Sequence, residues 1–363
     1  MELVILIVKV IFVLFIVALH LAAFCTWIER KGSALIQDRI GANRAAAYIE
    51  TDIFILKPLF FFIRIMGGLG IINTLVNDAV KAIMKEDFIP EGVSNFVHCL
   101  GPFLAVFPIF VAYAVMPMAP NFELFGYQIT TQIAPIDAGV LFLFAMGSIS
   151  VYGVALAGWT GNNKFSLLGG LRAAAQMISY ELAMGIAFVT TIVVYGTLDL
   201  YKMVDAQSSL WGVFYQPLTF LILFTVGMAE TKRAPFDLPE SESELAAGYF
   251  TEYSGMKFLL FWLGEFGEIA LFSFLITVLF FGGWHLPFLT FAAGSWLGAL
   301  VGFAILMTKV IFFCVLQIVI RWTLPRFRFD QLMNLGWKIL LPLSLVNLML
   351  YGALKLLGVL PTV

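Results

Sequence analysis

Charged residues are scarce in this chain, and their scarcity excludes an ordinary soluble domain. Asp, Glu, Lys and Arg make up 12% of its 363 residues, whereas 61% of the residues are hydrophobic. A soluble globular domain carries about 25% charged residues. Long apolar runs separated by polar segments predict a polytopic membrane protein instead. Segments of about ten residues with alternating polar and apolar side chains are lacking, so we expect membrane helices and not a β-barrel.

Cysteine and histidine are also scarce. Cys25, Cys99 and Cys314 lie far apart in or beside apolar runs, and the three histidines are scattered. The sequence contains no CxxC motif, no Walker A loop and no GxGxxG followed by a soluble βαβ pattern. We therefore expect no metal, Fe–S cluster, nucleotide or flavin to be held by this chain, and no nucleic-acid partner. Any redox cofactors are expected in partner proteins.

The apolar runs predict a single all-α membrane domain over residues 1–363 with about eight transmembrane helices. The expected helices cover approximately residues 3–27, 95–117, 137–158, 176–197, 212–229, 256–281, 296–320 and 336–358. The first run lacks a cleavage site and is too long for a signal peptide, so we interpret it as a retained helix. Arg30, Lys31, Arg39 and Arg44 follow it, and by the positive-inside rule this end is cytoplasmic and the N-terminus is outside. Of the Lys and Arg residues, only Lys202 falls in a loop expected to be external.

Residues 45–93 admit two interpretations. The apolar stretch 53–76 is interrupted by Lys57, Pro58 and Arg64, so it either spans the membrane or lies in its plane. We favour an in-plane amphipathic segment, because a further crossing would invert every later loop. The polar side of this segment would then carry Asp78, Lys81, Lys85 and Glu86.

The acidic loop, residues 230–255, is the part of the chain that is densest in charge. Its carboxylates are Glu230, Asp237, Glu240, Glu242, Glu244 and Glu252, against only Lys232 and Arg233. Pro235 and Pro239 stiffen the loop, and ESESEL is expected to begin a short helix whose N-terminus favours negative charge. Two interpretations stay open: a cytoplasmic site that handles protons or charge, or a solvated loop docked on the basic face of a partner.

Three carboxylates fall within the apolar runs. Glu265 and Glu268 are three residues apart on one helix, and Glu181 lies near the cytoplasmic end of another. A charged group at this depth costs roughly 2.5–3.5 kcal/mol even on lenient scales. Each is either a protonated, hydrogen-bonded structural residue or part of a carboxylate relay that starts from the acidic loop. Lys309 in the seventh run is either a counter-ion or a surface residue that snorkels to the interface.

Two basic segments are less specific. RWTLPRFRFDQLMNLGWK after the seventh run is either an interfacial anchor or the border of an entrance for an amphipathic ligand. Residues 161–176, with Lys164 and Arg172, are expected to form a glycine-rich cytoplasmic turn.

Four motifs together resemble one family. They are WIERKGSALIQDRIGANR (27–44), GGLRAAAQMISYE (169–181), ETKRAPFDLPESESELAAGYFTEY (230–253) and PRFRFDQLM (325–333). The chain resembles, over nearly its whole length, the family of membrane subunits that join the two arms of respiratory complex I, the NADH:quinone oxidoreductase. The mitochondrial members of this family are called subunit 1. The resemblance implies eight helices and a quinone chamber shared with two peripheral-arm subunits, next to other membrane-arm subunits and lipid. It also implies a bacterial inner (cytoplasmic) membrane location, and FMN and Fe–S clusters only in partner subunits.

The resemblance also assigns residues. Positions that match the quinone chamber or its loops are Arg30, Arg39, Arg233, Phe236 and Arg321. Positions that match a proton or charge relay are Asp78, Glu181, Glu230, Asp237, Glu240, Glu244 and Glu265. The implied function is to couple quinone reduction to proton translocation through this carboxylate chain.

The chain departs from the family in the stretch between its first helix and Asp78. After the first helix it reads RIGANRAAA, with Ala42 where the family usually has proline, and the following segment to Asp78 is longer and more apolar than usual. Transfer of site residues is weakest there. Two rival functions remain: the homologous anchor of a membrane-bound hydrogenase or other donor-linked complex, and a stand-alone proton-coupled transporter.

Overall fold

Helices make up most of the residues that the structure describes, which confirms the predicted all-α polytopic membrane fold. The computed structural model describes residues 2–41, 70–71, 76–124, 126–239, 241–287 and 294–358. Within these ranges seven helices are long and apolar enough to cross a membrane. The further apolar helix Pro217–Glu230 has 14 residues, about 21 Å at 1.5 Å per residue, and is shorter than a bilayer core.

Most of the described elements are helices, and the strands form one short hairpin. The long helices and their extensions are α1 (Glu2–Val10), η1 (Ile11–Leu19), α2 (His20–Ile36), α5 (Asn95–Ala112), η4 (Tyr113–Val115), α6 (Gly139–Thr160), α7 (Lys164–Tyr195), α10 (Pro217–Glu230), α12 (Gly255–Phe280), α13 (Trp296–Thr323), α14 (Phe329–Asn334), η6 (Leu335–Leu340) and α15 (Leu341–Leu356). The short helices are α4 (Asp78–Met84), α8 (Leu200–Asp205), α9 (Gly212–Tyr215), α11 (Glu242–Leu245) and η5 (Gly248–Phe250). Strands β1 (Phe122–Leu124) and β2 (Tyr127–Ile129) form an antiparallel hairpin.

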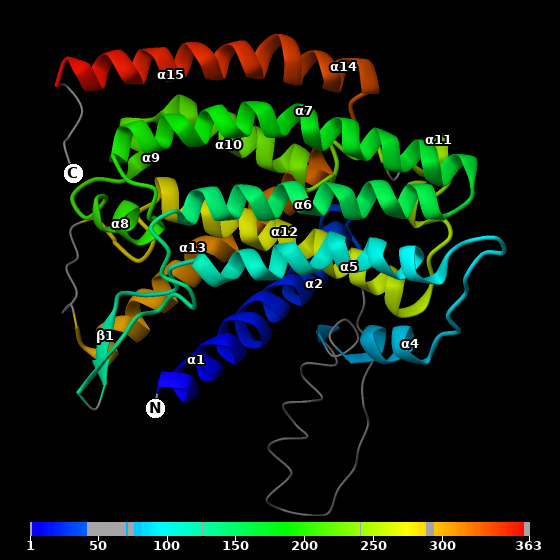
Figure 1. Ribbon diagram of the computed structural model, residues 1–363, viewed down its shortest axis with the longest axis horizontal. Helices are drawn as coiled ribbons and strands as arrows, with labels where there is room; N and C mark the ends of the chain where they lie inside the picture. Colours follow the sequence, from blue (N-terminus) through cyan, green and yellow to red (C-terminus); the bar gives the residue numbers. More distant parts are fainter. Residues whose placement is uncertain are drawn as a thin grey trace, which may run out of the picture.

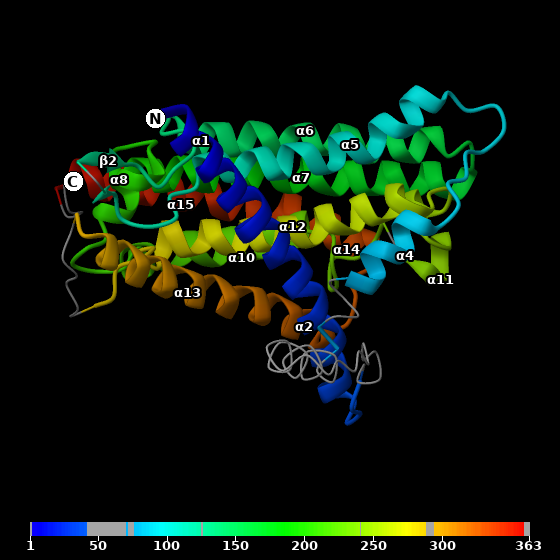
Figure 2. The ribbon, with the colours of Figure 1, turned by 90° about the horizontal axis from the view of Figure 1, so that it is seen from below.

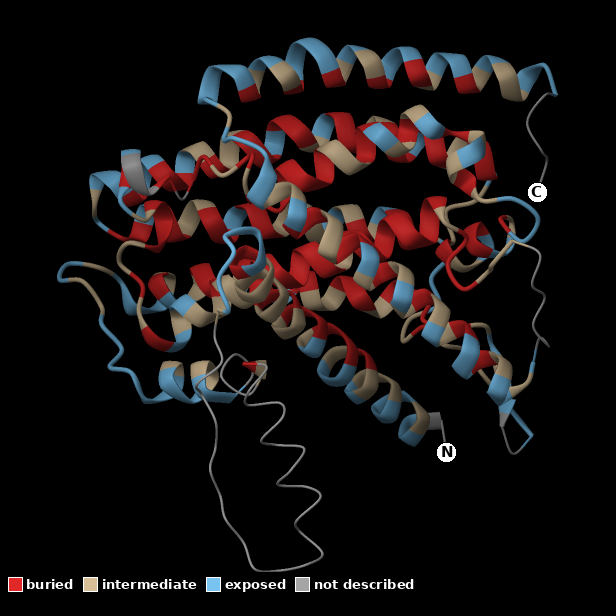
Figure 3. Cartoon of the chain, turned by 180° about the vertical axis from the view of Figure 1, so that it is seen from behind, coloured by how far each residue is buried: buried red, intermediate tan, exposed pale blue. Residues whose placement is uncertain are grey.

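The long helices pack in layers around α12. Helices α15, α7, α6 and α5 lie side by side in that order, and α10 and α12 pack behind them (Figure 1). Helix α13 lies beyond α10 and α12, and the continuous helix α1–α2 crosses the bundle obliquely (Figure 2). Of the candidate spans, α12 is the most buried, whereas α15 exposes its outer side (Figure 3). Side chains on α12 are therefore shielded by helices on several sides.

The two ends of the bundle differ. The beginning of α1 and the end of α15 lie toward the end that carries α8, α9 and the β-hairpin, and α4, α11 and α14 lie toward the other end (Figures 1 and 2).

Local signals explain where helix α7 begins and ends. The side chain of Asn163 accepts a hydrogen bond from the N–H of Phe165 at the start of α7, and Gly196 ends this helix with a left-handed φ of 73°.

The glycine-rich segment 161–176 was predicted as a turn, and this prediction is wrong. Helix α7 begins at Lys164 and runs through the segment. The glycines permit close packing instead: a Cβ on Gly169 would lie 2.6 Å from Cα of Gly248, and one on Gly170 would lie 2.8 Å from Cα of Gly158. The backbone of α7 thus approaches both α6 and the acidic loop.

Other expected boundaries also move. The first helix continues to Ile36, so Arg30 and Lys31 lie on the helix and not in a loop after it. The expected helix 212–229 is divided at Gln216 into α9 and α10, and the last helical stretch begins at Phe329. The predicted short helix in ESESEL is α11, with only four residues. Of the in-plane segment 45–93, only 70–71 and 76–93 lie within the described residues, so the question of residues 53–76 and the departure at Ala42 lie outside them.

Candidate functional site

A cluster of buried charges lies where the loop after α10 meets the middle of α12. The Arg233 guanidinium forms an ion pair with Oε2 of Glu265, and the side chains are 6% and 3% exposed. Tyr249 donates a hydrogen bond to Oε1 of the same carboxylate at 2.9 Å. The guanidinium carbon of Arg233 also lies 4.8 Å from the ring centroid of Phe266. Because the pair is buried, loss of either partner would leave an uncompensated charge in the interior.

A second buried pair lies beside the first. Nζ of Lys232 is 3.4 Å from Oε2 of Glu268, three residues after Glu265 on α12. The ammonium also approaches Sδ of Met177 on α7 at 3.9 Å. Burial alone would lower the pKa of Lys232, but the surrounding carboxylates outweigh burial and raise it. Lys232 therefore stays charged in the interior.

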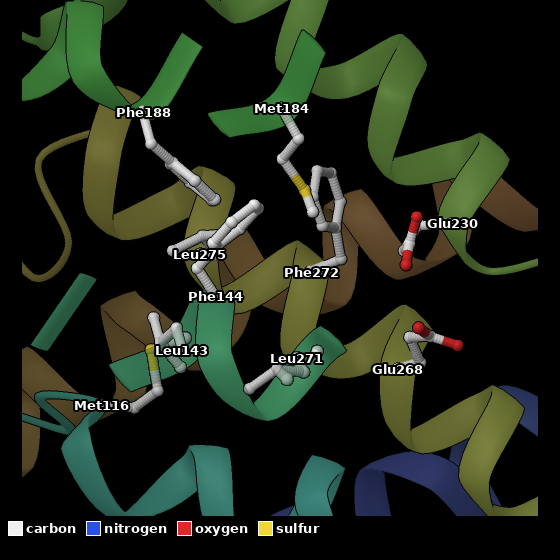
Figure 4. Close-up of a pocket in the computed structure, with 11 residues that line it drawn as sticks. Met116, Leu143, Phe144, Met184, Phe188, Glu230, Glu268, Leu271, Phe272 and Leu275 are labelled. Carbon is white, nitrogen blue, oxygen red and sulfur yellow. The ribbon is translucent and has the colours of Figure 1, made fainter. Parts of the chain in front are cut away.

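Glu230 and Glu268 border a cavity of about 70 Å³ (Figure 4). A single water needs about 10–15 Å³ on this measure, so the cavity has room for several waters. Neither carboxylate oxygen of Glu230 has a hydrogen-bond partner among the described residues, although the residue is only 5% exposed. The remaining walls are mostly apolar: Met116, Leu143, Phe144, Gly147, Met184, Phe188, Leu271, Phe272 and Leu275. Two carboxylates thus lie at one side of an apolar chamber inside the bundle.

The loop that carries the cluster is held by α7. Nε2 of Gln176 donates hydrogen bonds to the carbonyls of Ala229, at 2.7 Å, and Phe236, at 2.9 Å. The buried Phe236 ring packs against Tyr180 on one side and Phe327 on the other. These contacts hold the first part of the acidic loop, up to Phe236, against α7.

Asp237, next to this aromatic contact, is a half-buried carboxylate. Burial raises the pKa of Asp237, and the negative charge of Glu265 acts in the same direction. Nearby guanidinium groups, Arg233 foremost, oppose the increase without cancelling it. Asp237 is therefore a group that takes up a proton more readily than an exposed aspartate.

A second, smaller cavity, of about 10 Å³, is lined in part by Arg233. Its lining includes Arg233, Thr231 and Gln317, together with Glu29 from α2 and Arg321 from α13. The Arg321 guanidinium and the Glu29 carboxylate form an ion pair with side chains 17% and 14% exposed. Arg233 therefore connects two environments: it lines this cavity and pairs with Glu265 in the buried cluster.

The charges of the cluster do not balance among the residues that the structure describes. Lys232 and Arg233 supply two cations, whereas the carboxylates number four: the buried Glu230, Glu265 and Glu268 and the half-buried Asp237. An isolated ionised carboxylate is costly to bury, so such a group tends to bind a proton. The arrangement can hold protons and can pass a change of charge from one carboxylate to the next.

The other residues assigned from the sequence lie apart from this cluster. Ser148 donates to Oε1 of Glu181 at 2.9 Å beside a crevice of about 430 Å³ between α6, α7 and α15. Phe144 lines both this crevice and the cavity of Glu230, so the two spaces are adjacent. Glu244 forms an exposed ion pair with Arg172 at 2.6 Å.

The residues near the in-plane segment form a separate group. Arg30 pairs with Asp78 at 2.6 Å and so ties α4 to α2. Nε of the exposed Arg39, which follows the end of α2, donates to Oε1 of Gln37 at 2.7 Å. Glu240 lies outside the described residues.

Sequence reasoning missed three members of the site, because Lys232, Tyr249 and Glu29 were given no role. Glu268 was considered as a possible relay carboxylate but was not assigned to the site. The spacing of three between Glu265 and Glu268 on one apolar helix was the available signal for Glu268. The others became visible only through contacts between distant segments.

The structure favours neither of the two interpretations of Lys309. Its ammonium donates hydrogen bonds to the carbonyls of Phe281, Gly283 and His285 at 2.7, 2.8 and 2.7 Å. It therefore caps the end of α12 and has a structural role. Among the described residues, no group of three or more His, Cys, Asp or Glu could hold a metal ion.

Fold and site together define a class: a multi-pass helical membrane protein with an unbalanced cluster of charges beside the middle of its central helix. Comparison with known proteins identifies the family. Residues 8–352 match the family described as "NADH dehydrogenase", and the chain belongs to this family.

Curated relatives agree with this assignment. The chain is 41% identical over 351 residues to the NADH-quinone oxidoreductase H subunit of Flavobacterium johnsoniae, with 96% of this chain and 94% of the relative covered. It is 43% identical over 339 residues to an H subunit of the same enzyme from Geobacter metallireducens, with 93% of each chain covered. The corresponding protein of Leptospira biflexa is 43% identical over 346 residues, which cover 93% of this chain and 91% of the relative.

Proposed function

We propose that this chain is the membrane subunit of a proton-pumping NADH:quinone oxidoreductase that forms part of the quinone chamber. In this proposal it couples quinone reduction to proton translocation through its buried carboxylates. Family membership supports the complex, and the single observation that carries the coupling is the position of Arg233 between the second cavity and Glu265. The proposal places the N-terminus outside a bacterial inner membrane, and the charged loop at the cytoplasmic face.

We assign the guanidinium groups beside the second cavity to the border of the quinone chamber; the cavity itself, about 10 Å³, has room for about one water and not for a quinone. A quinone has an apolar body and a polar head, and its reduction takes up two electrons and two protons. Arg321 and Arg233 offer guanidinium donors there, and the buried Phe236 lies in the same loop as Arg233. Arg30 and Arg39 on and after α2 are assigned to the approach to this chamber. The electron carriers, FMN and Fe–S clusters, belong to the peripheral-arm partners in this proposal.

Coupling follows from electrostatics. Negative charge that develops at the quinone head attracts Arg233, the only cation that both lines the second cavity and pairs with Glu265 among the described residues. A weaker Arg233–Glu265 pair leaves a buried carboxylate uncompensated, and Glu265 then takes up a proton. The change of charge passes to Glu268 and Glu230 at the first cavity, and from there toward Glu181. Asp237, Glu240, Glu244 and Asp78 are assigned to the cytoplasmic part of this path.

The substitution Glu265→Gln tests the coupling. We expect quinone-dependent NADH oxidation to fall about ten-fold or more, which corresponds to about 1.4 kcal/mol of activation free energy. NADH oxidation by a soluble artificial acceptor, which bypasses the chamber, should stay within about two-fold of the wild type.

Asp137→Asn is the matched control, because Asp137 is an exposed carboxylate that pairs with Lys202 at the opposite end of the bundle. It should leave both activities unchanged. Wild-type quinone turnover in Glu265→Gln would refute the relay, and an equal loss of both activities in that variant would indicate a defect of assembly.

A further inference from the structure

The ammonium of Lys232 is poorly coordinated for a buried charge. Charge-assisted N–H···O contacts are usually about 2.7–2.9 Å long, whereas Lys232 reaches Glu268 only at 3.4 Å. It also contacts the Met177 thioether at 3.9 Å, which is a weak acceptor. An ammonium has three donors, and Lys232 is only 4% exposed. In this position the three N–H donors of the Lys232 ammonium are therefore not all satisfied by strong acceptors.

A buried carboxylate that lacks hydrogen-bond donors lies nearby in the sequence. Glu230 precedes Lys232 by two residues, is 5% exposed, and has no hydrogen-bond partner for either oxygen among the described residues. Lys232 adopts a left-handed φ of 54° in the turn that follows α10, and its side chain returns to the interior. Glu230 is within electrostatic range of both Lys232 and Glu268.

The two carboxylates on either side of this exchange border one cavity. Glu230 and Glu268 lie one above the other at the same side of the cavity (Figure 4), and its volume of about 70 Å³ admits several waters. A long, flexible lysine side chain beside two carboxylates can exchange partners without a change in the helices. The charged groups around it are Glu230 on α10, Glu265 and Glu268 on α12, and Arg233 in the same loop, with Glu181 of α7 further away.

We propose that Lys232 is a shared counter-charge that alternates between Glu268 and Glu230 and thereby determines which of the two carboxylates holds a proton. Lys232 acts as a positioning residue: it does not touch the quinone, and it directs a proton through the carboxylates that border the first cavity. This inference rests on the proposed function for its role in turnover, but the exchange of partners is a property of the chain alone.

The test compares Lys232→Met with the double variant Lys232→Met/Glu268→Leu in the assembled complex. A membrane-permeant carbodiimide reacts with protonated buried carboxyl groups, and mass spectrometry of peptides measures the adduct on Glu230 as a function of pH. In both variants we expect the pH of half-maximal labelling of Glu230 to rise by about one unit or more, because Glu230 has lost its counter-charge. The pH profile of quinone-dependent NADH oxidation should shift in the same direction.

The double variant distinguishes a Lys232 that alternates between Glu230 and Glu268 from a Lys232 that pairs only with Glu268. Lys232 and Glu268 in a permanent pair add no net charge, so their joint removal would leave the labelling of Glu230 and the pH profile as in the wild type. That result would overturn the proposal, and so would a fall in activity with an unchanged pH profile.

Lys257→Met is the matched control, because Lys257 is also a largely buried lysine, 12% exposed, that pairs with Asp87 at the start of α12. It should leave the labelling of Glu230 and the pH profile unchanged, and a shift equal to that of Lys232→Met would count against a specific role of Lys232. If the wild-type complex lacks quinone-dependent activity, the proposed function fails, and the labelling still decides whether Lys232 is shared.

Discussion

At the scale of single residues, Arg233 links the buried ion pair with Glu265 to the second cavity. It pairs with Glu265, lies over the Phe266 ring and lines the cavity that also contains the Glu29–Arg321 pair. A guanidinium is always charged and offers several donors in a fixed plane, so it can serve a carboxylate and a cavity at once. A lysine at this position could not pair with Glu265 and also present a donor to the second cavity in the same fixed plane.

Asp237 makes the stability of the protein depend on pH. Burial raises the pKa of Asp237, so the folded protein binds this proton more tightly than the unfolded chain does. The bound proton therefore stabilises the fold at pH values below about 3.9, the ordinary value, and this contribution is lost as the pH rises through the raised folded value. The asparagine in Asp237→Asn cannot ionise, so the variant does not lose this contribution. The Tm of the variant minus the Tm of the wild type should therefore increase as the pH rises from about 4 to 7.

The measurement is thermal unfolding of the purified complex at several pH values, followed by tryptophan fluorescence. A difference in Tm between Asp237→Asn and the wild type that stays constant across this range would show that Asp237 has the same proton affinity in both states. Oδ1 of Asp237 has no hydrogen-bond partner among the described residues, so the amide should not lose a bond that this oxygen accepts.

At the scale of elements, close backbone contacts between helices depend on glycine. A Cβ on Gly153 of α6 would lie 2.3 Å from the backbone nitrogen of Ala105 and 2.7 Å from the carbonyl carbon of Leu104, both on α5. Backbone atoms cannot move aside as a flexible side chain can. A Cβ on Gly147, also on α6, would meet nothing within 4 Å.

We therefore predict opposite results for the same substitution at two places on one helix. Gly153→Ala should destabilise the protein by about 1–3 kcal/mol through overpacking of α5 against α6. Gly147→Ala should be neutral or slightly stabilising, since alanine gains up to about 1 kcal/mol of helix propensity over glycine. Denaturation in mixed detergents measures both, and equal effects would mean that the α5–α6 approach is looser than this packing implies.

The sequence predicted the elements well where physical chemistry is local. Apolar runs long enough to cross a bilayer predicted helices, because a backbone in lipid must satisfy its own hydrogen bonds. The prediction for residues 161–176 failed because glycines that admit a neighbouring helix look the same in sequence as glycines that make a turn. The role of Lys309 was hidden for a similar reason: its acceptors are backbone carbonyls, which every residue has.

The candidate site was predictable in part. The density of charge in residues 230–255 and the depth of Glu265 within an apolar run identified the region, because buried charge is costly. The partners Tyr249, Lys232 and Glu29 were not predictable, since ion pairs between distant segments depend on how helices pack. The pairing of Arg321 with Glu29 joins residues almost 300 positions apart in the chain.

At the scale of the whole molecule, the surface itself indicates partners or lipid on many sides. On α15, Val346, Met349 and Leu350 are 64%, 77% and 52% exposed. Such apolar exposure is stable only against acyl chains or other transmembrane helices. The buried charges, by contrast, lie where the loop after α10 meets α12. The proposed peripheral-arm partners would bind at the end of the bundle that carries α4, α11 and α14 (Figure 1).

The size and composition of the assembly can be measured directly. With a tag on the C-terminus and extraction in mild detergent, we expect a particle much larger than the 40.3 kDa chain, with bound iron and flavin from partner subunits. Apolar flanks and a charged end that need partners make isolation of the chain alone unfavourable. Size-exclusion chromatography with light scattering gives the mass, and metal and flavin analysis gives the composition. Iron and nickel without flavin would instead identify the hydrogenase-linked relative. An intact particle of the mass of one chain, free of cofactors, would favour the transporter and would remove the basis for assigning Arg233 and Arg321 to a quinone.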